Sequence, residues 1–352
     1  MDSGDMNAQD KQRYTLLDGL RGLAALGVIL DHVPSGPLVH IFPGRYLGVQ
    51  FFFVLSGFVM CHAYRERLAS GMSAIELLRV RFIRLYPLYL LAFAIAAVLA
   101  LAYAVAGWRH YHPHELATMI WFGALMLPTP FSRGGALYPL NGPSWSLFFE
   151  LVVNFIYSLV ARWLTPAVFV VMLTVSGSTY VWSCFAHTAA TGAWQWSHFD
   201  MGLSGVIYDF FMGVLIYEIS TRRRLPQPPA WLAFIVYLAI LMVSLHGVQL
   251  QAWIAFVSII LMPLLVALFA NSEVKGAFSK VCALSGALSY GVYILHVPIA
   301  GAITAITDKL KLPPGQGMGM YFLVASTALL AAAIADVCYD RPARKLLNRL
   351  FA

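Results

Sequence analysis

The sequence predicts an all-α polytopic membrane protein, and three observations support this fold class. Of the 352 residues, 60% are hydrophobic and only 11% are charged, whereas a soluble domain carries about a quarter charged residues. The mean hydropathy is +0.74. Apolar segments recur along the whole chain, and a spanning helix needs about 20 such residues. Together these observations exclude an ordinary cytosolic enzyme, a disordered chain and a secreted scaffold.

The loop charges predict how many of the apolar segments cross the membrane. Treating segment 115–130 as re-entrant, with the N-terminus inside, puts 17 Lys and Arg residues on the cytoplasmic side and 5 outside, whereas crossing by every segment gives 10 and 12. Cytoplasmic loops carry an excess of Lys and Arg, so we expect about ten transmembrane helices plus a re-entrant segment, with both termini cytoplasmic. The candidate segments are 15–33, 46–63, 84–107, 115–130, 144–163, 166–186, 203–220, 230–247, 250–271, 285–305 and 319–338.

This topology divides the chain into three parts. Residues 1–14 form a polar cytoplasmic tail without a removable signal peptide, residues 15–338 form the transmembrane domain, and residues 339–352 form a cytoplasmic C-terminal tail. The net charge of +7 is explained by cytoplasmic loops, so no nucleic-acid partner is expected. The four cysteines lack metal-ligand spacing, and the histidines at 110, 112 and 114 lack an acid or Cys partner. We therefore expect no metal.

The first apolar segment contains four ionisable residues, and such residues inside a span are functional candidates by default. Asp18 and Arg21 are three apart and can pair on one helix face. Arg21 and His32 are eleven apart, which is three turns plus about 20°, so both side chains face the same way about 16 Å apart along the axis. A structural pair at the membrane interface would explain Asp18 and Arg21 alone. With His32 on the same stripe, the pattern favours a polar channel.

Polar residues also follow one face of two later segments. Ser146, Glu150 and Asn154 are spaced by four, and Glu150 is the only acid in its span. Ser146 and Asn154 can be helix-packing hydrogen bonders, whereas a desolvated carboxyl often does proton work. In the later segment, Tyr290, Tyr293 and His296 are spaced by three. The tyrosines can belong to an interfacial belt, or the three side chains can line a polar cavity.

A basic turn precedes the third predicted span. Arg81 and Arg84 are three apart and project together once helical. They can be anchors for lipid headgroups or a clamp for the phosphates of a cytosolic donor. In the second span, the small residues Ser56 and Gly57 predict a close approach between helices.

Together these segments resemble the membrane-bound acyltransferase family 3, which includes O-antigen and exopolysaccharide O-acetylases. The motifs follow the family's order and cover nearly the whole chain. They are Asp18-Gly19-Leu20-Arg21-Gly22 with His32, the FFFVLSGF run at 51–58, Arg81 and Arg84 with Tyr86-Pro87, Ser144-Trp145-Ser146 with Glu150, and Ser289-Tyr290 with His296 and Pro298. The C-terminal Asp340-Arg341-Pro342 departs mildly from the family's tail.

The resemblance implies an O-acyltransferase of the bacterial inner membrane. Its donor would be cytosolic acyl-CoA, usually acetyl-CoA, and its acceptor a hydroxyl of a cell-surface or lipid-linked carbohydrate. Arg21 and His32 would be the essential pair, and Arg81 and Arg84 would hold the coenzyme's phosphates. Substrate contacts are also expected from Ser144, Trp145, Ser146, Tyr290, His296 and Asp18. Some members carry an extra periplasmic domain, so this chain is expected to act alone or with a separate periplasmic or polysaccharide-assembly partner.

Our mechanistic hypothesis assigns His32 as the base that deprotonates the acceptor hydroxyl, because histidine is the side chain most commonly used as a general base near neutral pH. Glu150 would orient His32 or relay its proton, and Arg21 would stabilise charge on the thioester carbonyl. A two-step route with the acyl group carried on His32 is equally compatible with the sequence. Three alternatives to the enzyme stay open at this point, namely a proton-coupled transporter, a flippase of a lipid-linked sugar, and a structural helper of an assembly complex.

Overall fold

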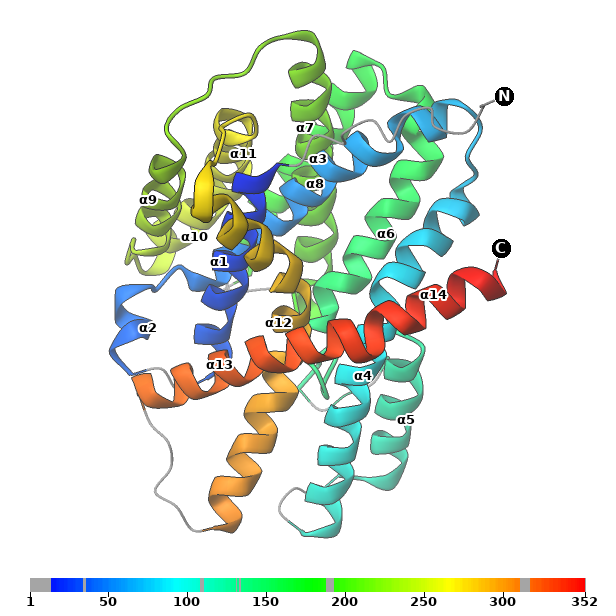
Figure 1. The fold of residues 1–352 in the computed structure, drawn as a ribbon, viewed down its shortest axis with the longest axis vertical. Helices are drawn as coiled ribbons and strands as arrows, with labels where there is room; N and C mark the ends of the chain where they lie inside the picture. The colour runs from blue at the N-terminus through cyan, green and yellow to red at the C-terminus, as the bar shows by residue number, and fades with distance from the viewer. Residues whose placement is uncertain are drawn as a thin grey trace.

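The computed structural model describes residues 14–33, 36–107, 111–130, 132, 134–187, 193–310 and 317–351. Within these ranges the regular secondary structure is helical, apart from one isolated bridge between Ala136 and Gln195. Figure 1 shows the helices forming a single bundle. The α-helices are α1 (Thr15–His32), α2 (Pro37–Ile41), α3 (Gly48–Ala69), α4 (Ala74–Val105), α5 (Pro113–Ala124), α6 (Ser144–Val160), α7 (Pro166–Ala186), α8 (Phe199–Arg222), α9 (Ala230–Leu241), α10 (Gly247–Phe256), α11 (Met262–Phe269), α12 (Gly276–Lys309), α13 (Met318–Ala335) and α14 (Arg341–Leu350).

Eight of the described helical segments are long and apolar enough to cross a membrane. They contain α3, α4, α6, α7, α8, α10 with α11, α12, and α13 with α14. Helix α1 has 18 residues but carries three charged ones, and α9 has only 12. The structure therefore confirms an all-α polytopic membrane protein, and every predicted span contains a helix. The full count of ten crossings and the side on which the termini lie stay predictions.

The segment 115–130, which the loop charges predict to be re-entrant, contains only a short helix. Helix α5 has 12 residues, which is about 18 Å and too short for the hydrocarbon core. Beyond it the chain turns through Met126, which has a positive φ of 58°. Tyr86 and Tyr89 of α4 each donate a hydrogen bond to a carbonyl at the end of α5, at 2.7 and 2.6 Å. This helix is thus held against protein, as a non-spanning segment in a membrane must be.

Two pairs of helices pack backbone against backbone in the centre of the bundle. A Cβ added to Gly57 of α3 would lie 1.8 Å from the carbonyl oxygen of Phe210 in α8, and one added to Gly213 would lie 2.0 Å from that of Val54. Between α1 and α12, a Cβ on Gly22 would collide with Ser285. The close approach predicted at Gly57 is confirmed, and Gly22, beside Arg21, lets the side chain of Ser285 in α12 lie directly against the backbone of α1.

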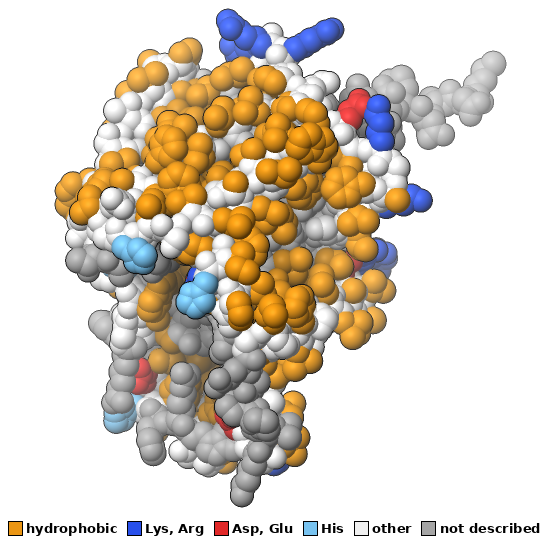
Figure 2. Space-filling model, turned by 90° about the vertical axis from the view of Figure 1, so that its left-hand side faces the viewer, with side chains coloured by type: hydrophobic (Ala, Val, Ile, Leu, Met, Phe, Trp, Pro, Cys, Tyr) orange, Lys and Arg blue, Asp and Glu red, His pale blue; other side chains and the backbone are white. Residues whose placement is uncertain are grey.

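The outside of the bundle is apolar. Figure 2 shows hydrophobic side chains over much of this face, with Lys and Arg gathered at its upper and side margins. Large hydrophobic residues are strongly exposed on several helices, including Val105, Trp121 and Leu330. Such an extensive apolar surface is unusual for a soluble monomer and fits contact with lipid chains.

Candidate active site

Two neighbouring cavities contain most of the residues that the sequence singles out. We call the first the arginine cavity, which has a volume of about 300 Å³. Helices α1, α3, α4, α6 and α12 contribute to it. Its polar lining consists of Arg21, Ser56, Arg81, Arg84, Ser146, Glu150, Ser289, Tyr290 and Tyr293.

Arg21 is fixed by the close packing of α1 on α12. Its Nε donates to the hydroxyl of Ser289 at 2.9 Å, and its Nη2 donates to the carbonyl of Gly286. The same Nη2 lies 3.2 Å from Oδ1 of Asp18, so the predicted pair on one helix face is present. Because the neighbouring glycines allow this approach, the guanidinium is held in one orientation at the cavity wall.

Glu150 has a different partner from the one that the sequence analysis expects. Its carboxylate forms an ion pair with Arg81 of α4 and accepts a hydrogen bond from Ser56 of α3 at 3.2 Å. His32 lines a different cavity, and its ring contacts the carbonyl of Val28 and the ring of His296. A role of Glu150 in orienting His32 stays a prediction, but its carboxylate is paired with Arg81 rather than with His32. The reason is that the inward face of α6 packs beside α4, which brings a cation to the carboxylate first.

Arg84 also lines the arginine cavity but is held more loosely than Arg81. Its Nη1 lies 4.0 Å from Oδ2 of Asp340, and 43% of its side chain is exposed, compared with 17% for Arg81. Asp340 is almost completely buried and forms a closer ion pair with Arg344. Arg84 is thus the cation with more freedom to meet a ligand's phosphate. Nearby, Tyr290 donates to the carbonyl of Leu85 at 2.6 Å, which ties α12 to α4.

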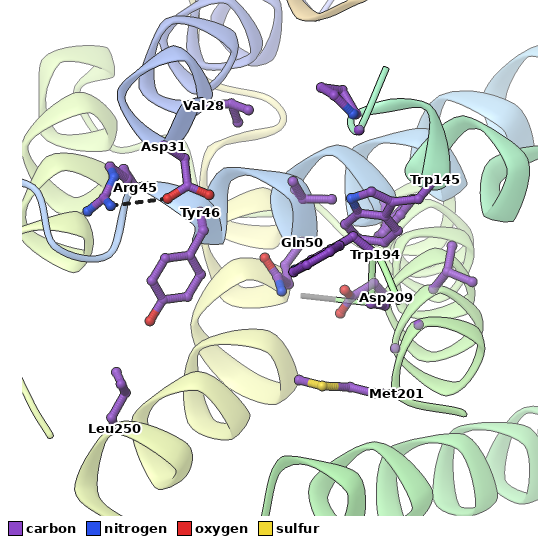
Figure 3. A pocket seen from close by; sticks show the side chains of 18 of the residues that line it. Val28, Asp31, Arg45, Tyr46, Gln50, Trp145, Trp194, Met201, Asp209 and Leu250 are labelled. Atoms are coloured by element: carbon purple, nitrogen blue, oxygen red, sulfur yellow. Dashed lines mark ion pairs between the residues drawn. The ribbon is translucent and has the colours of Figure 1, made fainter. Parts of the chain in front are cut away.

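The second cavity is larger, about 660 Å³, and we call it the histidine cavity. Figure 3 shows its interior, including the ion pair of 3.2 Å between Asp31 and Arg45. Asp31 is therefore paired with Arg45 and not with the adjacent His32. The polar and aromatic lining includes Asp31, His32, Arg45, Tyr46, Gln50, Trp145, Tyr180, Trp194, Asp209, His246 and Tyr293.

His32 and His296 face each other edge to face, with ring centroids 4.9 Å apart. In each ring Nδ1 lies close to the carbonyl of the residue one turn earlier, at 3.1 Å from Val28 and 3.2 Å from Val292. A carbonyl only accepts, so Nδ1 carries the proton and Nε2 of a neutral ring has a lone pair. His32 is exposed whereas His296 is fully buried, so His32 is the imidazole that a ligand can reach.

The two cavities share three lining residues, Val49, Phe53 and Tyr293. We call this shared wall the constriction. The hydroxyl of Tyr293 lies 2.7 Å from that of Ser146 and also donates to the carbonyl of Pro143 at 3.3 Å. The sequence analysis expects one channel shared by Arg21 and His32. The structure instead places them in two adjacent cavities on the same side of α1, because aromatic side chains fill the middle.

The other candidates fall in three places. Trp145 lines the histidine cavity, although its neighbours Ser146 and Glu150 line the arginine cavity. Ser144 is fully buried and, like Asp18, is absent from both linings. His110 of the histidine cluster lies outside the described residues. In the described part of the chain, no group of three or more His, Cys, Asp or Glu residues could hold a metal ion.

Sequence reasoning misses two polar residues of the histidine cavity. Asp209 lies inside the α8 span, and Gln50 lies at the start of α3. An ionisable residue within an apolar segment is the signal that identifies Glu150, and the same signal identifies Asp209. No comparable signal marks Gln50, since an amide near a helix end is common.

Comparison with known proteins shows to which family this chain belongs. Residues 14–337 match the family model described as "Acyltransferase domain". Protein 2 in the picA locus of Rhizobium radiobacter is 42% identical over 174 residues, which cover 45% of this chain and 86% of that protein. Acyltransferase MdmB of Streptomyces mycarofaciens is 28% identical over 380 residues, which cover 96% of this chain and 93% of its own. No solved structure matches. Since the family model covers nearly the whole chain, the protein belongs to the acyltransferase 3 family and is a membrane enzyme that transfers acyl groups.

Proposed function

We propose that the protein moves an acyl group, in the simplest case acetyl, from acyl-CoA to a hydroxyl of a cell-surface or lipid-linked carbohydrate. The observation that carries this proposal is the pair of cavities with different chemistry, which meet at the constriction. A polyanionic donor fits the cavity lined by three arginines. A neutral acceptor with hydroxyl groups fits the cavity lined by His32 and two tryptophans.

The donor's phosphates would lie among Arg21, Arg81 and Arg84. Guanidinium groups bind phosphate oxygens through paired, charge-assisted hydrogen bonds. Glu150 offsets part of the charge of Arg81, so Arg84 and Arg21 supply most of the attraction. This arrangement assigns Arg21 to donor binding rather than to the thioester carbonyl, since it is held about 16 Å along α1 from His32.

The acyl end of the donor would reach the constriction, where His32 can act on the acceptor. Nε2 of His32 takes the proton of the acceptor hydroxyl while its oxygen attacks the thioester carbon. The carbon–sulfur bond breaks, the acyl group stays on the acceptor oxygen, and the proton passes from His32 to the departing thiolate. In the two-step alternative, Nε2 itself accepts the acyl group and later yields it to the hydroxyl.

We base the proposed setting of this reaction on the predicted orientation of the chain, with both termini cytoplasmic. We assign the enzyme to the bacterial inner membrane, with the arginine cavity toward the cytoplasm that contains acyl-CoA. The histidine cavity then faces outward, where surface carbohydrates are assembled. A separate assembly partner could deliver the acceptor, and the bilayer could deliver a lipid-linked one.

The test is a transfer assay with purified protein in lipid nanodiscs and acetyl-CoA labelled in the acetyl group. We expect release of free coenzyme A and label on a carbohydrate acceptor extracted from the host's membranes. A host lacking the gene is expected to lose acyl groups from one surface glycan. Absence of both acetyl-CoA binding and turnover, together with movement of a sugar lipid across liposomes, would instead identify a transporter.

A further inference from the structure

Asp209 is a carboxyl group buried without a partner. It is 1% exposed, and neither of its oxygens has a hydrogen-bond partner among the described residues. It lines the histidine cavity. Buried polar groups in proteins are almost always hydrogen-bonded, and an isolated carboxylate inside a membrane protein costs several kcal/mol. Its position thus calls for a ligand or a function.

Three other buried or partly buried acids among the described residues each have at least one carboxylate oxygen paired, although Oδ1 of Asp340 also lacks a hydrogen-bond partner. Asp200, nine residues earlier on α8, accepts from Ser183 at 2.5 Å and contacts Nε2 of His187 at 3.0 Å. Glu150 has Arg81, and Asp340 has Arg344. The contrast on a single helix indicates that the absence of a partner is specific to Asp209 and not a general feature of α8.

A second polar group and two aromatic rings accompany Asp209. Oε1 of Gln50 is also buried and has no hydrogen-bond partner in the described structure. Figure 3 shows the Gln50 and Asp209 side chains directed into the space that Trp145 and Trp194 border. Ligand sites are mostly apolar and aromatic with a few placed polar groups, in cavities of roughly 300 to 1,000 Å³, and the histidine cavity has this composition and size.

We propose that Asp209 and Gln50 form a recognition subsite for a ring that carries several hydroxyl groups, such as one sugar residue of the acceptor. This inference rests on the proposed function, since it names the group that is presented to His32. The carboxyl and the amide oxygen accept hydrogen bonds from hydroxyls that do not react. The indole rings contact the apolar face of the sugar, and a further hydroxyl meets Nε2 of His32.

Asp209→Asn and Gln50→Leu test this subsite, with Asp200→Asn as the matched control on the same helix. Binding of methyl glycosides of glucose, galactose, mannose and N-acetylglucosamine is measured by calorimetry in nanodiscs, with cyclohexylmethanol as the probe that has a single hydroxyl. The native protein is expected to bind at least one glycoside and not cyclohexylmethanol. Each cavity variant is expected to weaken that binding about tenfold or more, because a buried hydroxyl of the bound glycoside then loses its acceptor oxygen, and the control retains it.

The infrared frequency of the Asp209 carbonyl stretch is a second measurement, because it would not change on ligand binding if Asp209 had only a structural role. In infrared difference spectra the glycoside is expected to shift one carboxyl band, and Asp209→Asn is expected to remove that shifted band while Asp200→Asn retains it. Glycoside binding by folded Asp209→Asn and Gln50→Leu at native affinity would overturn the subsite, as would failure of the native protein to bind any of the four glycosides. Binding that depends on Asp209 in a protein without acetyl-CoA turnover would retain the subsite and reject the proposed function.

Discussion

The two cavities differ in how their polar groups are satisfied. In the arginine cavity, each charged group interacts with a group on another helix. Arg81 forms an ion pair with Glu150, Arg84 lies near Asp340, and Arg21 donates a hydrogen bond to Ser289 of α12. In the histidine cavity, Asp31 is paired with Arg45, but the hydrogen bond of His32 is to a carbonyl of its own helix, and Asp209 has no hydrogen-bond partner in the described structure. A prebuilt set of charges suits a ligand of constant structure such as a coenzyme, whereas unsatisfied groups suit a ligand that supplies the missing hydrogen bonds.

The largest expected effects come from removing one principal group from each cavity. His32→Ala is expected to reduce acyl transfer by about 10²- to 10⁴-fold, the usual contribution of a general base, while donor binding is retained. Arg21→Ala is expected to abolish transfer through loss of donor binding. Both are measured with labelled acetyl-CoA on protein that remains inserted in the membrane. His114→Ala on exposed α5 is the control, and full transfer by a well-folded His32→Ala protein would refute the assignment.

Glu150→Gln separates its two possible roles. Removal of one member of a buried ion pair destabilises a protein by about 3 to 5 kcal/mol, so we expect a clear loss of thermal stability and a higher KM for the donor. The exposed pair of Glu273 and Lys275 provides the control, because Glu273→Gln should change stability by less than about 0.5 kcal/mol. A shifted pH profile of kcat with an unchanged donor KM would restore a role of Glu150 in proton transfer to His32.

Arg84→Gln is expected to act on donor binding alone. Hydrogen bonds to charged groups contribute about 1.5 to 3 kcal/mol, which is roughly a 10- to 100-fold rise in KM for acyl-CoA. Arg67→Gln on α3 is the control, since Arg67 is exposed and absent from the lining of the arginine cavity. Equal effects of the two substitutions would mean that only the general positive charge of this surface matters.

The smallest effects are expected at the constriction. Ser146→Ala and Tyr293→Phe each remove one hydroxyl of a pair 2.7 Å apart. Each should lower kcat/KM a few fold, and the double variant should reveal a coupling of about 1 kcal/mol, typical of one hydrogen bond. Strictly additive losses would show that the two hydroxyls act independently, and the boundary between the cavities would then need another explanation.

The sequence predicts the helices well because lipid allows little other backbone structure. Every apolar segment contains a helix, and residue spacing correctly pairs Asp18 with Arg21. The spacing of eleven correctly places Arg21 and His32 on one side of α1, which is a property of a single helix. It does not reveal the aromatic constriction between them, because Phe53 and Tyr293 come from two other helices.

Contacts between side chains on different helices could not be predicted from the sequence. Glu150 meets Arg81, and His32 meets His296, but no spacing rule relates residues so far apart in the chain. Small residues are a signal from which the pairing of α1 with α12 could have been predicted, since Gly19 and Gly22 of α1 face Cys282 and Ser285 of α12. A register of small residues on both helices specifies which turns meet, and thus which polar groups can lie together.

The joint between α13 and α14 has a practical consequence for work with this protein. A π-helical turn at Asp336–Asp340 links the two helices, and its last carboxylate lies between Arg344 and Arg84. Arg79 additionally donates to the carbonyl of Phe351. A bulky fusion that pulls α14 away from α4 would strip Arg84 of its counter-charge, so affinity tags belong elsewhere. A small fluorophore on α14, by contrast, would sense when phosphate arrives and competes for that arginine.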